Sequence, residues 1–461
     1  MRKIHNINND WYFSIDGKEK IVVNIPHTWN NIDGQDGGND YLRTLATYEK
    51  NFECPSFDRN CEDVYLEFDG VNSECDVFIN DQKVLRHEGG YSTFRKNITE
   101  VLKNGENHLL VKVDNRPNDR VYPQKADFTF YGGIYRDVKL IIVNKKRFDF
   151  DYFGGKGLQV TATPIEGYQK AKVSTNMWLS TDLGEVCVTV FDKEGNEVCK
   201  DTAHRSTTEC WSDMIIHNVH LWDGIDDPYL YTLKAELTID GKVVDEVQTR
   251  FGVRDFHYHP KTGFYLNGRK YALHGVSRHQ DRKGIGNAIT DEMHKEDMDL
   301  ICEVGANTIR LAHYQHSQTF YDLCDERGMV VWAEIPYISE HMPAGRANTL
   351  SQMKELIIQN YNHPSIVCWG VSNEITISTK DKKDMLDNHR ELNDLCHEMD
   401  KTRFTTLACY AVCGPFNKVA HITDTVSWNL YLGWYVPGLF LNDLWMRFFH
   451  FVYPDKSLGY S

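Results

Sequence analysis

The sequence predicts a multidomain protein of the β plus α/β class: a jelly-roll-like β-sandwich, an immunoglobulin-like β-sandwich and an incomplete (β/α)8 TIM barrel. Three observations predict this architecture. The first 255 residues contain short alternating apolar segments between turn residues, strand-like and helix-like segments alternate after them, and those later strands number fewer than eight. At 461 residues and 41% hydrophobic content, the chain is long enough for two to four packed domains.

Residues 1–145 have the pattern of an antiparallel sandwich. Apolar side chains alternate along Tyr65–Gly70, Cys75–Asn80 and His108–Asp114, and Asp-Gly and Asn-Asp pairs stand between such runs. Alternation buries one face of each strand, and these turn residues accept the tight backbone that joins antiparallel neighbours. The segment therefore predicts two stacked sheets of the jelly-roll type.

Residues 146–255 repeat this rhythm in a second set of strands. Gly184–Asp192 and Leu230–Leu237 are strand candidates, and Ile239–Lys242 supplies an Asp-Gly turn. Short strands at this spacing over about 110 residues are typical of an immunoglobulin-like sandwich.

From residue 256 to residue 461 the rhythm changes to strand, helix, strand, helix. That order favours a parallel sheet with crossover helices, as in a barrel. The predicted strands are Tyr271–Val276, Thr308–Ala312, Met329–Glu334, Ile366–Ser372, Phe404–Cys409 and Thr425–Asn429. The predicted helices are Asp291–Val304, Ser317–Arg327, Leu350–Asn360 and Lys383–Met399.

The strand count is six, and a seventh strand is expected to begin at about Ser457. A closed barrel of this type has eight strands, and an open one exposes a strand edge and apolar helix faces. We therefore expect the chain to be truncated within its barrel. A homo-oligomer or a complementing C-terminal fragment would cover the open edge.

Composition and charge limit the classes of molecule that the chain is expected to bind. The formal net charge of −15 disfavours binding to nucleic acid and to anionic membranes, so a neutral substrate is expected. No apolar signal core or membrane span is evident, which predicts a cytoplasmic protein. The 12 cysteines are scattered without a Cys-x-x-Cys pair, as expected for reduced thiols and not for a zinc site.

The pair Asn373-Glu374 is the most informative feature for function. It follows the apolar run Ser365–Ser372, which predicts a strand buried on both faces. In an α/β barrel the carboxyl ends of the strands face the active site, so Glu374 is a candidate general acid or base. The alternative is that Glu374 only caps the next helix.

Other polar residues gather at the ends of the predicted strands. Any one of them could have a structural role, but together at one end of successive strands they predict an active site. The set comprises Arg278, His279, Arg310, His313, Glu334, Asn373, Glu374, Tyr410, Trp428, Asn429 and Tyr431.

Short motifs along nearly the whole chain resemble those of family 2 glycoside hydrolases, and most closely those of its bacterial β-galactosidases. The motifs stand in the order of that family. They are Ile25–Asn30, Gly34–Gly38, Phe68–Ser73, Gly89–Ser92, Asp127–Asp137, Gly275–His279, Asn362–Ser365 and Ser372–Glu374.

The resemblance implies a sugar-binding-type β-sandwich at 1–145, the immunoglobulin-like domain and a catalytic barrel. It makes Glu374 the general acid/base of a retaining mechanism, which first protonates the leaving oxygen and then deprotonates water. It also implies that substrate-binding residues are Asp127, His279, His313, Asn373, Tyr410 and Trp428, with Asn373 bonding the 2-hydroxyl.

Two departures from the family pattern matter. The family's Glu-x-His magnesium motif is replaced by adjacent Glu340 and His341, so we expect no metal and regard Mg²⁺ as a weak alternative. The family's nucleophile, a glutamate after a serine on the seventh strand, would come directly after Ser461. Because retention needs two carboxylates about 5 Å apart, the isolated chain is expected to be inactive.

The leading hypothesis is therefore a retaining hydrolase of terminal β-D-galactosides. Two alternatives stay open. One is β-glucuronidase or another family 2 hydrolase, and the other is a non-catalytic sugar-binding fragment that needs a complementing C-terminal piece.

Overall fold

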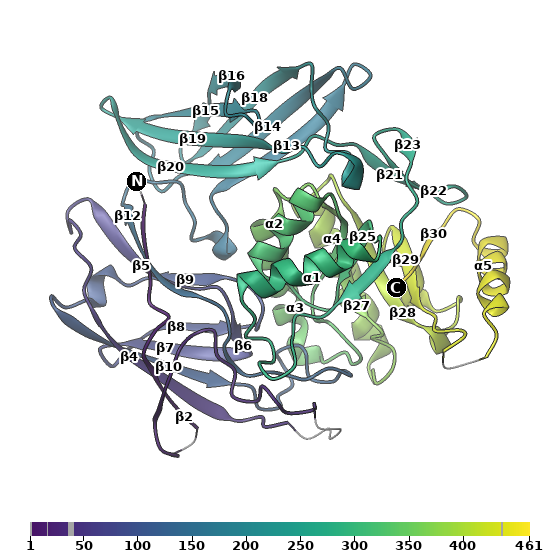
Figure 1. Ribbon diagram of the computed structural model, residues 1–461, viewed down its shortest axis with the longest axis horizontal. Helices are drawn as coiled ribbons and strands as arrows, with labels where there is room; N and C mark the ends of the chain where they lie inside the picture. The colour runs from purple at the N-terminus through teal and green to yellow at the C-terminus, as the bar shows by residue number, and fades with distance from the viewer. Residues whose placement is uncertain (1, 16, 36–40, 435–436) are drawn as a thin grey trace.

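The computed structural model describes residues 2–15, 17–35, 41–434 and 437–461. Its chain builds two β-sandwiches and an α/β unit in sequence order (Figure 1). The first sandwich, purple to blue, and the second, teal, lie against the α/β unit, whose C-terminal part is yellow. The fold class predicted from the sequence is confirmed.

The first sandwich contains a four-stranded sheet in the order β1-β12-β5-β9 and a six-stranded sheet in the order β3-β2-β4-β10-β7-β8, with a small β11-β6 pair. Burial alternates along β10, so its Leu109, Val111 and Val113 enter the core between the sheets. The strands are β1 (Lys3–Asn6), β2 (Trp11–Ile15), β3 (Ile21–Val23), β4 (Leu45–Glu53), β5 (Glu62–Phe68), β6 (Val71–Asn72), β7 (Glu74–Ile79), β8 (Gln82–Glu88), β9 (Phe94–Asn97), β10 (Glu106–Asp114), β11 (Gly133–Ile134) and β12 (Val138–Asn144).

The second sandwich pairs two four-stranded antiparallel sheets, β13-β14-β18-β17 and β16-β15-β19-β20. Strict alternation of exposed and buried residues along β18 shows that its sheet has one face in solvent and one face packed in the core. The strands are β13 (Leu158–Ile165), β14 (Lys170–Trp178), β15 (Glu185–Phe191), β16 (Glu197–Thr202), β17 (His204–Ser206), β18 (Glu209–His217), β19 (Tyr231–Ile239) and β20 (Lys242–Phe251).

A three-stranded antiparallel sheet, β21-β22-β23, links this domain to the α/β unit. Seven parallel strands then follow one another in sequence order from β24 to β30. The strands are β21 (Phe256–His259), β22 (Gly263–Leu266), β23 (Arg269–Lys270), β24 (Gly275–Arg278), β25 (Thr308–Leu311), β26 (Val330–Glu334), β27 (Ile366–Asn373), β28 (Phe404–Tyr410), β29 (Thr425–Asn429) and β30 (Ser457–Tyr460).

The parallel sheet is curled, and β24 and β30 stand at its two ends without pairing to each other. All eight residues of β27 are buried, as expected for a central parallel strand covered on both faces. The crossover helices are α1 (Asp291–Glu303), α2 (Gln318–Arg327), α3 (Arg346–Asn360), α4 (Lys382–Met399) and α5 (Phe440–Val452). Within the described ranges, none of these helices has the length and apolar character needed to cross a membrane.

Two elements differ from the sequence prediction. The first barrel strand was expected at Tyr271–Val276, but β24 begins only at Gly275, because Tyr271 packs with Trp222 and Phe264 in a separate cluster. Helix α5 was not predicted.

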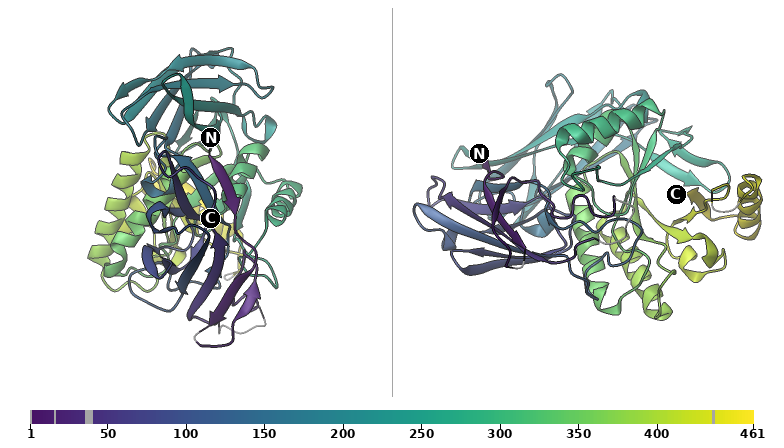
Figure 2. Two further views of the ribbon diagram at one scale, coloured as in Figure 1. Left: turned by 90° about the vertical axis from the view of Figure 1, so that its left-hand side faces the viewer. Right: turned by 60° about the horizontal axis from the view of Figure 1, so that its bottom comes forward.

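Helix α5 lies at the edge of the molecule in Figure 1 and in the right-hand view of Figure 2. Its Trp445 and Phe449 pack inward on the sheet, whereas Phe440, Leu444 and Phe451 are 69, 55 and 85% exposed. The expected apolar helix face is therefore present beside β30.

Candidate active site

The site forms where the parallel strands end. β24 to β29 run in one direction and each pairs in parallel with the next, so the residues at or after their carboxyl ends meet at one rim. This is the end of an α/β barrel where side chains from different strands converge. Side chains from five of these strand ends interact directly, as described below.

Glu374 follows β27 and is held in an unusual backbone conformation. Its φ is 47°, in the left-handed region that non-glycine residues seldom occupy, and its N–H donates to Ala408 O at 2.8 Å. Its Oε1 accepts from Asn429 Nδ2 at 2.8 Å. Burial raises the pKa of the Glu374 carboxyl, and the nearby Asp127 charge adds to that effect, against the Asn429 hydrogen bond. The group therefore holds a proton more readily than an ordinary glutamate.

A buried ion pair lies beneath Glu374. Arg310 of β25 donates from Nη2 to Glu334 Oε1 at 2.9 Å and from Nε to Oε2 at 3.1 Å, and both side chains are almost fully buried. Burial alone acts to raise the pKa of Glu334, but the charges and hydrogen bonds of Arg310 and His313 outweigh it and lower that pKa. Glu334 is therefore a fixed anion.

This ion pair orients two neighbouring side chains. Asn373 Oδ1 accepts from Arg310 Nη2 at 2.8 Å and from Asn429 Nδ2 at 3.1 Å, so the Asn373 amide nitrogen is turned away from both. His313 Nδ1 lies 2.6 Å from Glu334 Oε1. Because a carboxylate can only accept, Nδ1 carries the hydrogen and the other ring nitrogen, Nε2, is left for a ligand.

The first sandwich contributes a loop to this rim. Phe128 packs its ring 4.9 Å from that of His279 and 5.9 Å from that of His313. Asp127 is exposed beside it, and together with His279 it lines a cavity of about 1060 Å³. Burial lowers the pKa of His279 to about 4, so its ring is neutral at pH 7, and Tyr314 Oη lies 3.2 Å from its Nδ1.

The remaining two predicted site residues lie elsewhere. Tyr410 lines a separate cavity of about 630 Å³ beyond the end of β28. Trp428 is fully buried, with Trp445 and Phe449 of α5 packed against it at ring distances of 4.8 and 6.2 Å. The prediction that Trp428 offers a sugar platform is wrong, because its side chain points to the helix side of the sheet.

Sequence reasoning marked Asn429 and Arg310 only as strand-end residues, without a role. Side chains of successive strand residues point to opposite faces, so a buried Trp428 requires that Asn429 face inward. This alternation is the signal that could have assigned Asn429 to the site. Arg310 gave no such signal, because its partners come from other strands.

The Glu340–His341 pair does not offer a shared metal position. Glu340 pairs with Lys125 at 2.6 Å. His341 is buried, with its ring nitrogens 2.6 Å from Tyr337 Oη and 2.6 Å from Asp384 Oδ2. The two side chains therefore have separate partners.

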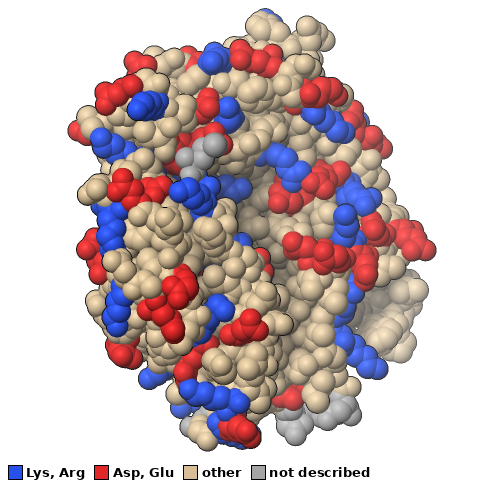
Figure 3. Space-filling view, turned by 60° about the vertical axis from the view of Figure 1, so that its left-hand side comes forward, with Lys and Arg blue, Asp and Glu red and all other residues tan. Residues whose placement is uncertain are grey.

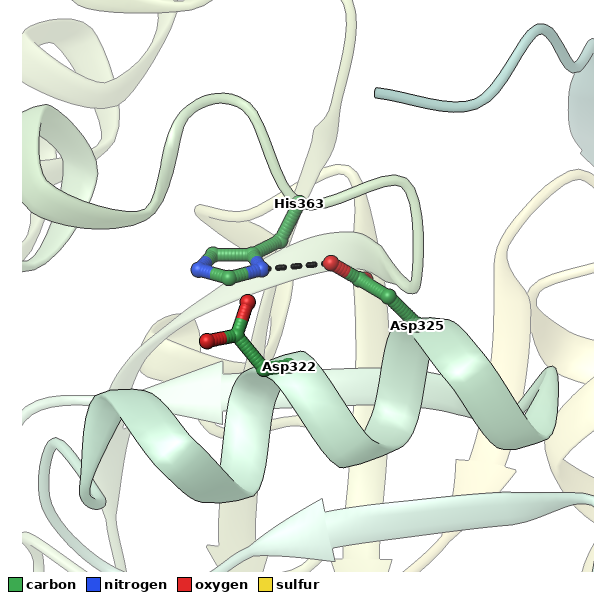
Figure 4. Close-up of side chains that lie close together, drawn as sticks. All are labelled: Asp322, Asp325 and His363. Carbon is green, nitrogen blue, oxygen red and sulfur yellow. Dashed lines mark hydrogen bonds and ion pairs between the residues drawn. The ribbon is translucent and has the colours of Figure 1, made fainter. Parts of the chain in front are cut away.

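One group of potential metal ligands is found among the described residues, at the opposite end of the barrel (Figure 4). Asp322, Asp325 and His363 place ligand atoms within 4.8 Å of one another. However, Asp325 Oδ2 lies 2.6 Å from His363 Nδ1, and Asp322 Oδ1 accepts from Arg250 at 2.8 Å. Asp322 thus joins α2 to Arg250 of the second sandwich, and Asp325 joins α2 to the loop before β27, so the group fits a structural role.

The surface charge is mixed. On the face shown in Figure 3, acidic and basic side chains are interspersed around a hollow, without a broad region of one sign. This face offers no extended basic surface of the kind that binds nucleic acid.

Three family descriptions match successive parts of the chain. They are the family 2 glycosyl hydrolase sugar-binding domain at residues 38–144, the family 2 glycosyl hydrolase domain at 158–254 and the family 2 TIM barrel domain at 260–452. These ranges follow the two sandwiches and the parallel sheet.

Several proteins are similar to most or all of the chain. A beta-glucuronidase of Bacteroides fragilis is 38% identical over 99% of this chain and 67% of its own length. A beta-galactosidase of Thermoanaerobacterium thermosulfurigenes is 32% identical over 88% of this chain and 58% of its own. The crystal structure of an FMN-binding beta-glucuronidase from Facaelibacterium prausnitzii L2-6 matches with a TM-score of 0.96 and 41% identity, over 100% of this chain and 72% of that one.

The fold and the three matched domains place the chain in a family of glycoside hydrolases. The chain belongs to glycosyl hydrolase family 2. It spans 67% of the Bacteroides enzyme and 53% of a beta-galactosidase from Thermoanaerobacter pseudethanolicus.

Proposed function

We propose that the chain forms the acid/base half of a retaining β-glycosidase, with Glu374 as the general acid/base. The observation that carries the proposal is the Glu374 carboxyl itself, partly buried, with a raised pKa and held by Asn429. A raised pKa keeps the proton available for the leaving oxygen, and the carboxylate formed afterwards can deprotonate water.

The neighbouring side chains supply sugar contacts. The free amide nitrogen of Asn373 would donate to the 2-hydroxyl, a bond that strengthens as the ring approaches an oxocarbenium ion. His313 and neutral His279 would bond sugar hydroxyls, and Asp127 would accept from them. These roles rest on the orientation that Arg310 and Glu334 impose on Asn373 and His313.

The second carboxylate of a retaining pair must stand about 5 Å from the first. Glu334 is unsuited to attack, because Arg310 and His313 occupy its oxygens and its side chain is 0% exposed. Asp127 is exposed on the sandwich loop and suits hydroxyl binding. We propose that the nucleophile is a carboxylate outside the residues described here.

For the substrate we propose a terminal β-glucuronide in place of the β-galactoside expected from the sequence. The support is similarity: the beta-glucuronidases cited above are 38 and 41% identical to this chain, against 32 and 30% for the two beta-galactosidases. A β-galactoside remains the second candidate, because both kinds of relative share these three domains.

The test compares chromogenic β-glucuronide and β-galactoside side by side. The chain is assayed alone and with the C-terminal segment of a relative added in trans, as Glu374→Gln and as the control Glu340→Gln. We expect turnover of the glucuronide only with the added segment, and its loss on Glu374→Gln but not on Glu340→Gln. Robust activity that survives Glu374→Gln would refute the assignment, and preferential turnover of the galactoside would refute the proposed substrate.

A further inference from the structure

A cavity borders the loop that follows Glu374. Its volume is about 630 Å³, a size typical of small-molecule sites. Its walls come from the loop after β27, the start of α4 and the segment after β28. Glu374 stands two residues before the lining residue Thr376, and its N–H donates at 2.8 Å to the carbonyl of Ala408, two residues before the lining residue Tyr410. The same two strand ends therefore hold the candidate acid/base and form this cavity.

The cavity and the predicted sugar contacts lie on different sides of Glu374. His279 and Asp127 line the cavity of about 1060 Å³, which shares no described residue with the smaller one. In the order of the parallel sheet, His279 follows β24, Glu374 follows β27, and Tyr410 ends β28. A general acid protonates the oxygen that joins the sugar to its leaving group, so the two parts of the substrate extend to either side of it. The smaller cavity is thus placed for the leaving group.

The walls of this cavity suit an apolar ring. Its apolar lining residues include Met385, Leu386, Tyr410 and Val412. Two of the polar lining residues already have partners, because Thr379 Oγ1 accepts from the N–H of His341 at 2.9 Å and Asn417 Oδ1 accepts from the N–H two residues further on at 3.2 Å. A second sugar would need several free polar groups, whereas an aromatic ring gains free energy from burial alone. The walls therefore favour an aromatic leaving group.

The charge at the cavity is positive. Lys382 and Lys418 line it, both are exposed, and neither forms an ion pair with another residue in the described ranges. No acidic side chain is among the described lining residues. Asp384, two residues after Lys382, is already held by His341 at 2.6 Å and by Arg346 at 2.7 Å. Two cations without partners beside an apolar wall complement a ring that carries a negative charge.

We propose that this cavity binds an aromatic leaving group that carries an anionic substituent. The walls bury the ring, and the two lysines attract the substituent. The inference rests on the proposed function, because it takes Glu374 to be the acid that protonates the leaving oxygen. Tyr410 then contacts the leaving group and not the sugar. Binding of the released aromatic compound needs no nucleophile, so the chain can be tested without turnover.

Two fluorescent coumarins with the same ring test the proposal. One is methylumbelliferone, and the other carries a carboxymethyl group in place of the methyl group. Each is titrated with the full chain, at low salt and at about 0.5 M salt. We expect the carboxylate compound to bind about threefold more tightly or better at low salt, and this preference to disappear at high salt, because the lysines are exposed and their charges are screened.

Matched variants assign the preference to the two lysines. The double variant Lys382→Ala, Lys418→Ala should weaken binding of the carboxylate compound about threefold or more and leave the neutral compound unchanged. Lys383→Ala is the control, because Lys383 is exposed, pairs with Asp387 at 2.9 Å and does not line the cavity. All four lysine and aspartate positions lie on the surface or at its edge, so these variants should keep the fold, which circular dichroism checks.

Equal affinities of the unaltered chain for the two coumarins would overturn the inference, and so would an equal loss of binding in Lys383→Ala. A complemented chain that cleaves aryl glycosides but shows no preference between the coumarins would refute this inference alone. A chain that prefers the carboxylate compound, but cleaves no glycoside when complemented, would refute the proposed function and leave the anionic aromatic site in place.

Discussion

The two sandwiches meet opposite ends of the same parallel sheet. The first inserts Asp127 and Phe128 at the carboxyl ends of the strands, against His279 and His313. The second contacts the loop that precedes β27, where Val160 N donates to Asn362 Oδ1 at 2.8 Å. In an α/β barrel the carboxyl end carries the chemistry and the amino end contributes stability. The end that each sandwich contacts therefore decides whether it builds the site or supports the fold.

The side chains at the two contacts differ in the same way. At the carboxyl end, Asp127 is exposed and makes no hydrogen bond to another described residue, so its carboxylate is available to a ligand. At the amino end, Arg250 is paired with both Asp322 and Glu326. Asp127 at the first contact is thus available to a ligand, whereas Arg250, Asp322 and Glu326 at the second contact are already in ion pairs.

The largest expected effect is on stability, through the buried ion pair of Arg310 and Glu334. Arg310→Ala leaves Glu334 charged, buried and paired only with His313, so the free energy of unfolding should fall by about 3–5 kcal/mol. Urea unfolding followed by circular dichroism measures it. A change below about 1 kcal/mol would mean that Glu334 takes up a proton or reaches water once Arg310 is removed.

A smaller effect, confined to binding, is expected at the first sandwich. Asp127→Ala should weaken sugar binding by about 1.5–3 kcal/mol, because a charged acceptor is lost, and leave stability unchanged. Isothermal titration calorimetry with glucuronate and with galactose measures it. Asp119→Ala, at an exposed residue preceding the same loop, is the control. If both variants bound the sugar with equal affinity, the first sandwich would not contribute to the binding site.

Asn429→Ala should change the acidity of Glu374. The Asn429 hydrogen bond stabilises the carboxylate and lowers its pKa, so its loss should raise that pKa further. In a complemented enzyme the alkaline limb of the pH–rate profile would then move to higher pH, because the acid stays protonated longer. Asn393→Ala, which removes the acceptor for Thr405 Oγ1 elsewhere in the barrel, should not move it. A shift to lower pH would contradict the assignment of Glu374 as the acid.

The smallest effect is expected at the second sandwich. Arg250 is 35% exposed, and its partners Asp322 and Glu326 are 51 and 45% exposed. Arg250→Ala should lower the free energy of unfolding by about 0–1 kcal/mol, with sugar binding unchanged. Thermal unfolding and the same calorimetry provide both measurements. If the variant lost sugar binding without losing stability, the second sandwich would also contribute to the site, and the two sandwiches would not differ in role.

Local periodicity carried most of the fold prediction. The strand at Thr425–Asn429 was predicted with its observed bounds, and each predicted helix overlaps an observed one. Helix α5 was missed because its sequence is rich in aromatic residues, whose propensity favours strands. β24 was placed too early because the apolar run at Tyr271 packs in a different cluster, and such packing is not visible in local sequence.

The position of a site residue was predictable only where it depends on the end of a single strand. Glu374 and His279 follow predicted strands, so their place at the rim follows from the fold alone. The orientation of Asn373 depends on Arg310 and Asn429, which come from two other strands. Trp428 was misjudged because the residues that cover it belong to α5, the unpredicted helix.

The outward face of α5 also determines how this chain behaves at the bench. Leu439, Phe440 and Phe451 are 74, 69 and 85% exposed, and exposed apolar area of this kind lowers solubility and favours adhesion to other apolar surfaces. Protein concentration, salt and container material thereby become variables in every measurement. Dilution series and a non-ionic detergent belong in each assay, so that loss of material is not mistaken for loss of function.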